Sequence, residues 1–113
     1  MKNTKNMEER YLGEKLKIKL SAKVIQSQNL ADMDWVAYLW CSSYKAKRIS
    51  KSEAIHLDDG SYALPLDTMD VGVGVLRGEV IAQVKDGDFD GGYRPTIGAR
   101  EVGVKIIKSV AIK

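Results

Sequence analysis

Apolar and polar residues alternate over residues 15–24, where the chain reads KLKIKLSAKV. One side of an extended chain would carry Leu16, Ile18, Leu20, Ala22 and Val24. The opposite side would carry four lysines and one serine. This period of two predicts a half-buried strand with lysine on its outer face. Such a lysine row is typical of a solvated face or a protected strand edge, and a groove that follows nucleic-acid phosphates is the alternative.

Residues 35–42, WVAYLWCS, are apolar on both sides of an extended chain, which is typical of a central strand. A domain of this size has one core, so only one side can pack inside it. The side with Leu39 and Cys41 has the small, wholly apolar profile of a core, and it also carries Trp35 and Ala37. We therefore predict that the other side, with a nearby aromatic residue, is an interaction surface formed by Val36, Tyr38, Trp40 and Tyr44.

The middle of the chain predicts shorter elements. Residues 44–54, YKAKRISKSEA, are too basic and polar for a core, so we expect a ragged strand or a loop. The turn residues DDG then separate Ile55–Leu57 from Tyr62–Leu66 in the pattern of a hairpin. Pro65 cannot donate a backbone hydrogen bond, so it should lie at a sheet edge or a bulge.

Two further strands follow the turn-rich residues 67–74. In VLRGEVIAQV one face carries Leu76, Val80, Ala82 and Val84, and in REVGVKII, residues 100–107, one face carries Val102, Val104 and Ile106. The predicted inward set therefore includes Leu16, Ile18, Leu20, Leu39, Leu76, Val80, Val102 and Val104.

These elements predict an all-β fold. The sequence shows no helical period over ten or more residues, and it contains about six or seven short strands separated by turns. We predict a two-sheet antiparallel sandwich of immunoglobulin-like type, with a barrel of the oligonucleotide-binding type as the alternative. Residues 1–12 are polar and predict a flexible tail, and residues 13–113 form a single domain.

Composition limits where in the cell the protein is expected and which ligands and cysteine chemistry are open to it. A formal net charge of +3 is too small to indicate nucleic-acid binding by itself. We find no apolar run near the roughly 18 residues of a membrane span and no apolar stretch of a secretory signal, so we expect a cytoplasmic protein. Cys41 is the single cysteine, which excludes an intrachain disulfide and a cysteine-based zinc cluster. Its apolar surroundings predict an inert, packed thiol.

The loop DGDFDGG, residues 86–92, is the strongest candidate for a metal site. Asp86, Asp88 and Asp90 are spaced like the first ligands of a calcium loop, with glycine in the next position. The twelfth position, however, is Ile97 in place of a bidentate glutamate, and strands flank the loop where helices should be. We therefore predict a solvated connection that needs no metal for folding.

The sequence contains no strong catalytic motif. His56 is the single histidine, and no nucleophile motif places a serine beside it. The paired carboxylates Asp58 with Asp59 and Asp67 with Asp70 lie in turns, where desolvation is rare. We therefore expect no enzyme and no cofactor.

The order of the motifs is more informative than any one of them. KLKIKL, YLWCSS, DDGSYALPLDT, VGVGVLRGEV, DGDFDGGYRP and VGVKI follow one another over residues 14–107. In this order the chain resembles small immunoglobulin-like proteins encoded in Bacteroides-type prophages, which are similar to the N-terminal domain of phage upper-baseplate proteins. Those motifs are structural and carry no catalytic residues.

The resemblance implies an assembly role in a phage tail or baseplate. The partners would then be protein subunits, possible self-association included, and the protein would assemble in the cytoplasm and become part of the virion. A sandwich module that binds carbohydrate or another protein is the alternative, and a binder of single-stranded nucleic acid is a further one.

Overall fold

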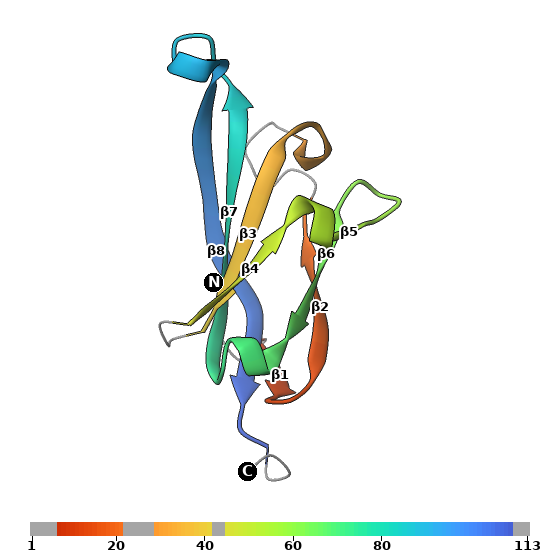
Figure 1. The fold of residues 1–113 in the computed structure, drawn as a ribbon. Helices are drawn as coiled ribbons and strands as arrows, with labels where there is room; N and C mark the ends of the chain where they lie inside the picture. Colours follow the sequence, from red (N-terminus) through yellow and green to blue (C-terminus); the bar gives the residue numbers. More distant parts are fainter. Residues whose placement is uncertain (1–6, 22–28, 42–44, 110–113) are drawn as a thin grey trace.

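The computed structural model describes residues 7–21, 29–41 and 45–109, and over these residues it is built from strands and short 3-10 turns, without an α-helix (Figure 1). The strands are β1 (Glu8–Tyr11), β2 (Lys15–Leu20), β3 (Asp34–Trp40), β4 (Ala46–Ser50), β5 (Ile55–His56), β6 (Tyr62–Asp67), β7 (Gly74–Lys85) and β8 (Tyr93–Ile107). The 3-10 turns are η2 (Leu30–Asp32), η3 (Lys51–Glu53), η4 (Thr68–Asp70) and η5 (Asp90–Gly92). The predicted all-β fold is confirmed.

The strands form two sheets. The larger has the order β1-β8-β7-β3-β4, and the smaller has the order β2-β6-β5. In the larger sheet β7 lies between β8 and β3, and β4 is added at the free edge of β3. The larger sheet of an immunoglobulin variable-type domain has the same arrangement. The predicted immunoglobulin-like sandwich is therefore confirmed. Its pairs are antiparallel, apart from β1 and β8, which run parallel.

The N-terminal residues that the structure describes are not a tail. Residues 8–11 form β1, which pairs with β8, and the Leu12 N–H donates to the Ile107 carbonyl at 2.8 Å. The buried hydroxyl of Thr68 then accepts from the Gly13 N–H at 2.8 Å. The prediction of a tail over residues 1–12 is wrong for this part because an edge strand with polar side chains shows no apolar period.

The predicted face of β2 is confirmed. Ile18 is buried, Leu16 and Leu20 pack against the core from half-buried positions, and the lysines between them are exposed. Ala22 and Val24 lie outside the described residues. Pro65 of β6 pairs with β2, whereas β5 ends its pairing at Ala63. Pro65 therefore has a strand neighbour on one side only, as its missing N–H requires.

The core lies between the two sheets. Trp35, Ala37, Leu39 and Cys41 are buried from β3 and the residue after it, which confirms the predicted inner face of this central strand. The Trp35 ring meets Tyr62 of the other sheet edge-on, with centroids 5.0 Å apart and planes at 76°. Every residue of the predicted inward set belongs to this core or packs against it.

Gly78 shows how tightly side chains of neighbouring strands pack over the inner face of the larger sheet. It occupies an inward position of β7 between the buried Leu76 and Val80. A Cβ at Gly78 would lie 3.2 Å from Leu39 Cδ2 and 3.5 Å from Val102 Cγ2. These two side chains fill the space that a larger residue would need, so the sequence carries a glycine in mid-strand.

The last strand is longer than predicted. β8 begins at Tyr93, where residues 100–107 were expected, and it pairs with β7 from Lys85 onward. The pairing of β3 with β7 ends at Asp34 and Gln83, so β3 does not extend beside the end of β7. Residues 84–94 therefore form a two-stranded extension, the hairpin arm, which projects beyond the sandwich in Figure 1 and contributes to extents of 53 × 31 × 28 Å.

Candidate interaction surface

The outer face of the five-stranded sheet is built from matched rows of side chains. One row joins Ser50, Val36, Ile81 and Ile97 across β4, β3, β7 and β8. The next row joins Arg48, Tyr38 and Glu79, and a third joins Ala46, Trp40 and Arg77. Paired residues on neighbouring strands point to the same side of a sheet, so these rows form one continuous surface.

The predicted interface residues share this surface as far as the structure describes them. Val36, Tyr38 and Trp40 alternate with the buried residues of β3 and are half-buried themselves. Charged residues on β4 and β7 stand opposite Tyr38 and Trp40 in the register. Tyr44 lies outside the described residues. The aromatic residues of β3 are thus partly covered, and the most exposed apolar side chains lie elsewhere.

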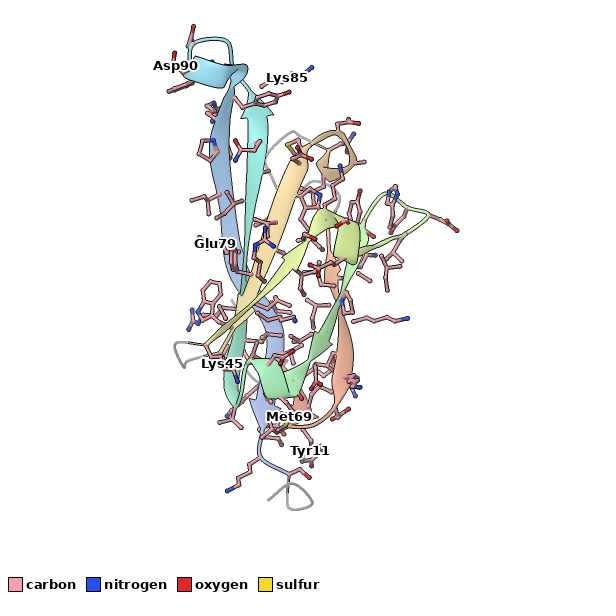
Figure 2. All side chains as sticks on the ribbon, viewed as in Figure 1. Tyr11, Lys45, Met69, Glu79, Lys85 and Asp90 are labelled. Carbon is pink, nitrogen blue, oxygen red and sulfur yellow. The ribbon has the colours of Figure 1, made fainter. Side chains whose placement is uncertain are left out.

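Three of the most exposed apolar side chains lie on the hairpin arm and at its base, whereas Tyr11 and Met69 are similarly exposed elsewhere on the molecule. Phe89 at the tip is 53% exposed, Tyr93 is 49% exposed and Ile97 is 59% exposed. Tyr93, Pro95 and Ile97 alternate along β8, so they lie on the same side of the hairpin as Ile81. Figure 2 places Lys85 and Asp90 near the tip of the arm. Sequence reasoning missed this stripe, although the alternation in YRPTI is its signal.

The aspartate loop forms the turn of the arm. Asp86 accepts from Arg94 Nε at 2.9 Å and from the Asp88 N–H at 3.1 Å. Asp88 and Asp90 are exposed, and both Gly91 and Gly92 have positive φ. Over the described residues, no group of three or more His, Cys, Asp or Glu side chains could hold a metal ion. The loop is a solvated connection closed by an ion pair.

Cys41 and His56 occupy unrelated environments. Cys41 is fully buried, its Sγ lies 3.3 Å from the Gly72 carbonyl oxygen, and burial raises the pKa of its thiol. His56 is exposed and stacks on Tyr62, with centroids 4.7 Å apart. The Ser61 hydroxyl donates to Asp59, and this hydrogen bond is the main cause of a lowered pKa of that carboxyl group. The Ser61 hydroxyl is thus engaged by the Asp59 carboxylate.

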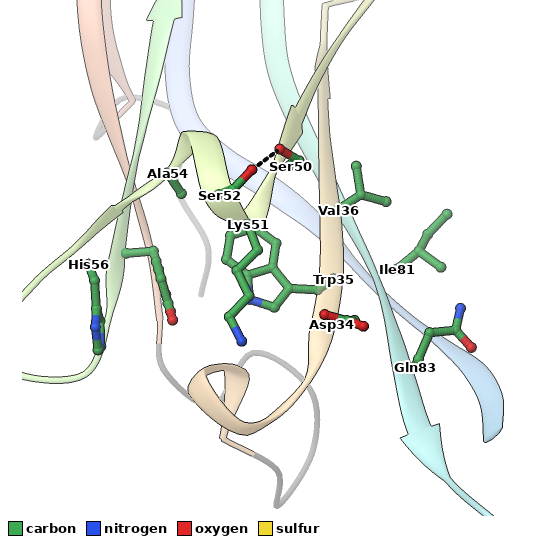
Figure 3. Close-up of a pocket in the computed structure, with 11 residues that line it drawn as sticks. Asp34, Trp35, Val36, Ser50, Lys51, Ser52, Ala54, His56, Ile81 and Gln83 are labelled. Atoms are coloured by element: carbon green, nitrogen blue, oxygen red, sulfur yellow. Dashed lines mark hydrogen bonds between the residues drawn. The ribbon is translucent and has the colours of Figure 1, made fainter. Parts of the chain in front are cut away.

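A depression lies where β4 leaves β3. β4 ends at Ser50, and η3 turns the chain away, supported by the Ser50 N–H, which donates to Glu53 at 2.8 Å. The hydrogen bonds from Ser50 also lower the pKa of Glu53. The depression has a volume of about 680 Å³, and Figure 3 shows it between His56 on one side and Ile81 on the other, with Trp35 in the middle. We call it the Trp35 depression.

The Trp35 depression is lined from both sheets. Its residues are Asp34, Trp35, Val36, Ser50, Lys51, Ser52, Ala54, His56, Tyr62, Ile81 and Gln83. Val36 and Ile81 also belong to the outer face, so the two features are continuous. No pattern in the sequence points to this depression, because its residues come from five separate strands and a turn.

The described residues contain no helix long and apolar enough to cross a membrane. The described surface has three notable features, which are the apolar stripe on the hairpin arm, the half-buried residues Val36, Tyr38 and Trp40 on the outer face, and the Trp35 depression. Comparisons of the chain with protein-family models, with curated proteins and with solved structures found no match.

Proposed function

We propose that this chain is a non-enzymatic interaction module that binds protein subunits of a larger assembly, of the phage tail or baseplate kind that its sequence resembles. The observation that carries the proposal is the apolar stripe of Tyr93, Pro95 and Ile97, which continues through Ile81 to Val36 on the outer face. Contiguous exposed apolar surface of this kind marks protein interaction sites.

The charge distribution around the stripe supports a protein partner. Arg48 and Glu79 flank Tyr38 in the second row of the outer face, and Arg77 stands beside Trp40 in the third. Protein interfaces combine an apolar centre with a polar rim, and aromatic residues are enriched at their strongest contacts. The first row would form the centre and the charged residues the rim.

The hairpin arm supports an assembly role by its position. A two-stranded hairpin is marginally stable alone, because neither face is covered by a second layer. Here the arm exposes Phe89 and Tyr93 about equally to solvent. An arm that lies on a neighbouring subunit would bury these rings and gain the missing layer. Such an arm would link copies or subunits in the proposed assembly.

Sedimentation velocity over a concentration series tests the proposal. We expect the isolated wild-type chain to self-associate, and Ile97→Lys to weaken that association about tenfold or more because it places a charge at the centre of the surface. Trp40→Ala should weaken it as well, with an unchanged circular dichroism spectrum.

Ile55→Lys is the matched control, because Ile55 is an exposed strand isoleucine, 40% exposed, on the smaller sheet. Equal effects of Ile55→Lys and Ile97→Lys would contradict the proposed surface. A wild type that stays monomeric, and that fails to co-purify with proteins encoded beside its gene, would contradict the proposed function itself.

A further inference from the structure

An apolar cleft of about 220 Å³ lies between the two sheets, on the side of β2 and β8. β2 contributes Ile18 and Leu20 to its walls, and β8 contributes Gly98 and Val102. Leu20 and Val102 are half-buried, so they lie near its opening. Gly98 pairs with the buried Val80, so it holds an inward position where a side chain would fill the space. We call this space the β2–β8 cleft.

Both strands that frame the β2–β8 cleft are sheet edges at this level. Among the residues that the structure describes, β2 pairs only with β6. On the side away from β7, β8 pairs only with β1, from Val104 to Ile107, so its earlier residues have no described strand beside them. A segment of another molecule therefore reaches the cleft between two edges, and no described strand has to move.

Lysines border the cleft along β2. Lys17 and Lys19 flank Ile18 and are exposed on the other face of the strand. Lys17 pairs with Pro65, which brings no charge. Lys19 forms a solvent-exposed ion pair with Asp59 at 3.2 Å. Because β2 is an edge strand, these long side chains also reach a segment that lies along its edge. The cleft therefore suits an apolar group with a negative charge on each side of it.

The tip of the hairpin arm has this complementary pattern. Phe89 is 53% exposed, and its backbone is extended, with φ −113° and ψ 150°. Neighbouring side chains in extended backbone point away from each other, so the two flanking aspartates do not follow the ring. Asp86 is paired with Arg94, whereas the exposed Asp88 and Asp90 form no ion pair within the described part of the chain.

We propose that the β2–β8 cleft binds the arm tip of a second copy of this chain. The Phe89 ring enters between the sheets, and Asp88 and Asp90 lie beside Lys17 and Lys19. A volume of about 220 Å³ holds one aromatic ring, since an apolar cavity of roughly 150 Å³ in another protein binds benzene. The inference rests on the proposed function, because it names a contact that the arm makes in the assembly.

The tip cannot enter the cleft of its own chain. Gly98 lies five residues after Tyr93 on one continuous strand, which is about 17 Å along β8. The turn projects further in the opposite direction, and Figure 2 shows Asp90 at the free end of the arm. Each copy therefore offers one tip and one cleft to other copies.

Exchanging the charges of the two sides tests the contact. One variant carries Asp88→Lys and Asp90→Lys at the tip, and the other carries Lys17→Glu and Lys19→Glu beside the cleft. Each variant alone should associate about tenfold more weakly than the wild type in sedimentation velocity, because like charges then meet. An equimolar mixture of the two should associate like the wild type, because every tip then meets a cleft of opposite charge.

The matched control is Lys105→Glu with Lys108→Glu. Both lysines are exposed at the other end of β8, and the net charge changes by the same amount. This control should associate like the wild type. Phe89→Ser tests the ring and should weaken association about tenfold. The proposal is overturned if the mixture fails to regain association, if the control weakens it equally, or if Phe89→Ser leaves it unchanged.

The outcomes separate this contact from the proposed function. If the charge variants and Phe89→Ser associate like the wild type while Ile97→Lys does not, the tip contact is overturned and the outer-face surface stands. A monomeric wild type also overturns the tip contact. Co-purification with a protein encoded beside the gene, abolished by Ile97→Lys, would in that case still support the proposed function.

Discussion

The sandwich body and the hairpin arm are made from the same two strands, and they differ in what surrounds those strands. Within the body, β7 lies between β3 and β8, and its residues Leu76, Val80 and Ala82 are buried against the other sheet. In the arm, β7 and β8 have only each other, and apart from the half-buried Val84 the side chains near the tip are mostly exposed. A ladder that runs from the body into the arm, from Arg77 to Lys85 of β7, therefore does not make a uniformly stable hairpin, because burial differs along it.

The largest expected difference between body and arm is the effect of removing an apolar side chain. Leu39→Ala should lower the free energy of unfolding by about 2 to 5 kcal/mol, because Leu39 is 1% exposed and its loss leaves a cavity. Phe89→Ala in the arm should change it by less than about 0.5 kcal/mol despite the larger ring. Urea unfolding followed by tryptophan fluorescence measures both, and equal effects would remove the distinction.

The two regions should also respond differently to an added methyl group. Gly78→Ala should destabilise the protein by about 1 to 3 kcal/mol, because its Cβ would meet Leu39 at 3.2 Å. Gly87→Ala in the arm, where nothing lies within 4 Å of the added Cβ, should change stability by less than about 0.5 kcal/mol. Thermal unfolding distinguishes these outcomes, and a tolerated Gly78→Ala would show that the Leu39 side chain can move aside.

The smallest expected effect concerns the turn of the arm. Asp86→Asn removes the ion pair with Arg94, and because this pair is solvent-accessible the global stability should fall by less than about 1 kcal/mol. Amide hydrogen exchange should nevertheless become faster at Asp88 and Gly92, since the turn opens without unfolding the body.

A further measurement tests whether the aspartates of this turn bind calcium. Millimolar calcium should leave the melting temperature of the wild type unchanged, because a site occupied only in the folded state would raise it by mass action. A clear rise that Asp88→Ala abolishes would show that the aspartates bind calcium.

The sequence predicted the body better than the arm for a physical reason. A strand with one face in the core and the other toward solvent must alternate, so the inner faces of β2 and β7 could be inferred from period two alone. The start of β8 was missed because Pro95 and Gly98 interrupt the apolar pattern, yet an edge position tolerates both. β1 was missed because its side chains at the sheet edge are polar, so it shows no apolar pattern either.

The candidate sites were predicted only in part. Val36, Tyr38 and Trp40 do share one face, as the spacing indicated, but their partial burial depends on side chains from β4 and β7 that pair with them across the sheet. The Trp35 depression could not be predicted. Tyr62 and Lys51, which line it together with Trp35, are distant from Trp35 in the sequence and come near it only in the folded sandwich.

The parallel pairing of β1 with β8 determines how the fold responds to mechanical force. When the chain is pulled from both ends, β1 is drawn toward its N-terminal side and β8 toward its C-terminal side. Two parallel strands pulled in this way slide past each other, so the four pairs from Glu8 with Val104 to Tyr11 with Ile107 bear the load together. An antiparallel pair at this position would unzip one residue at a time. In any structure that is placed under tension, β1 therefore acts as a clamp across the two ends of the domain.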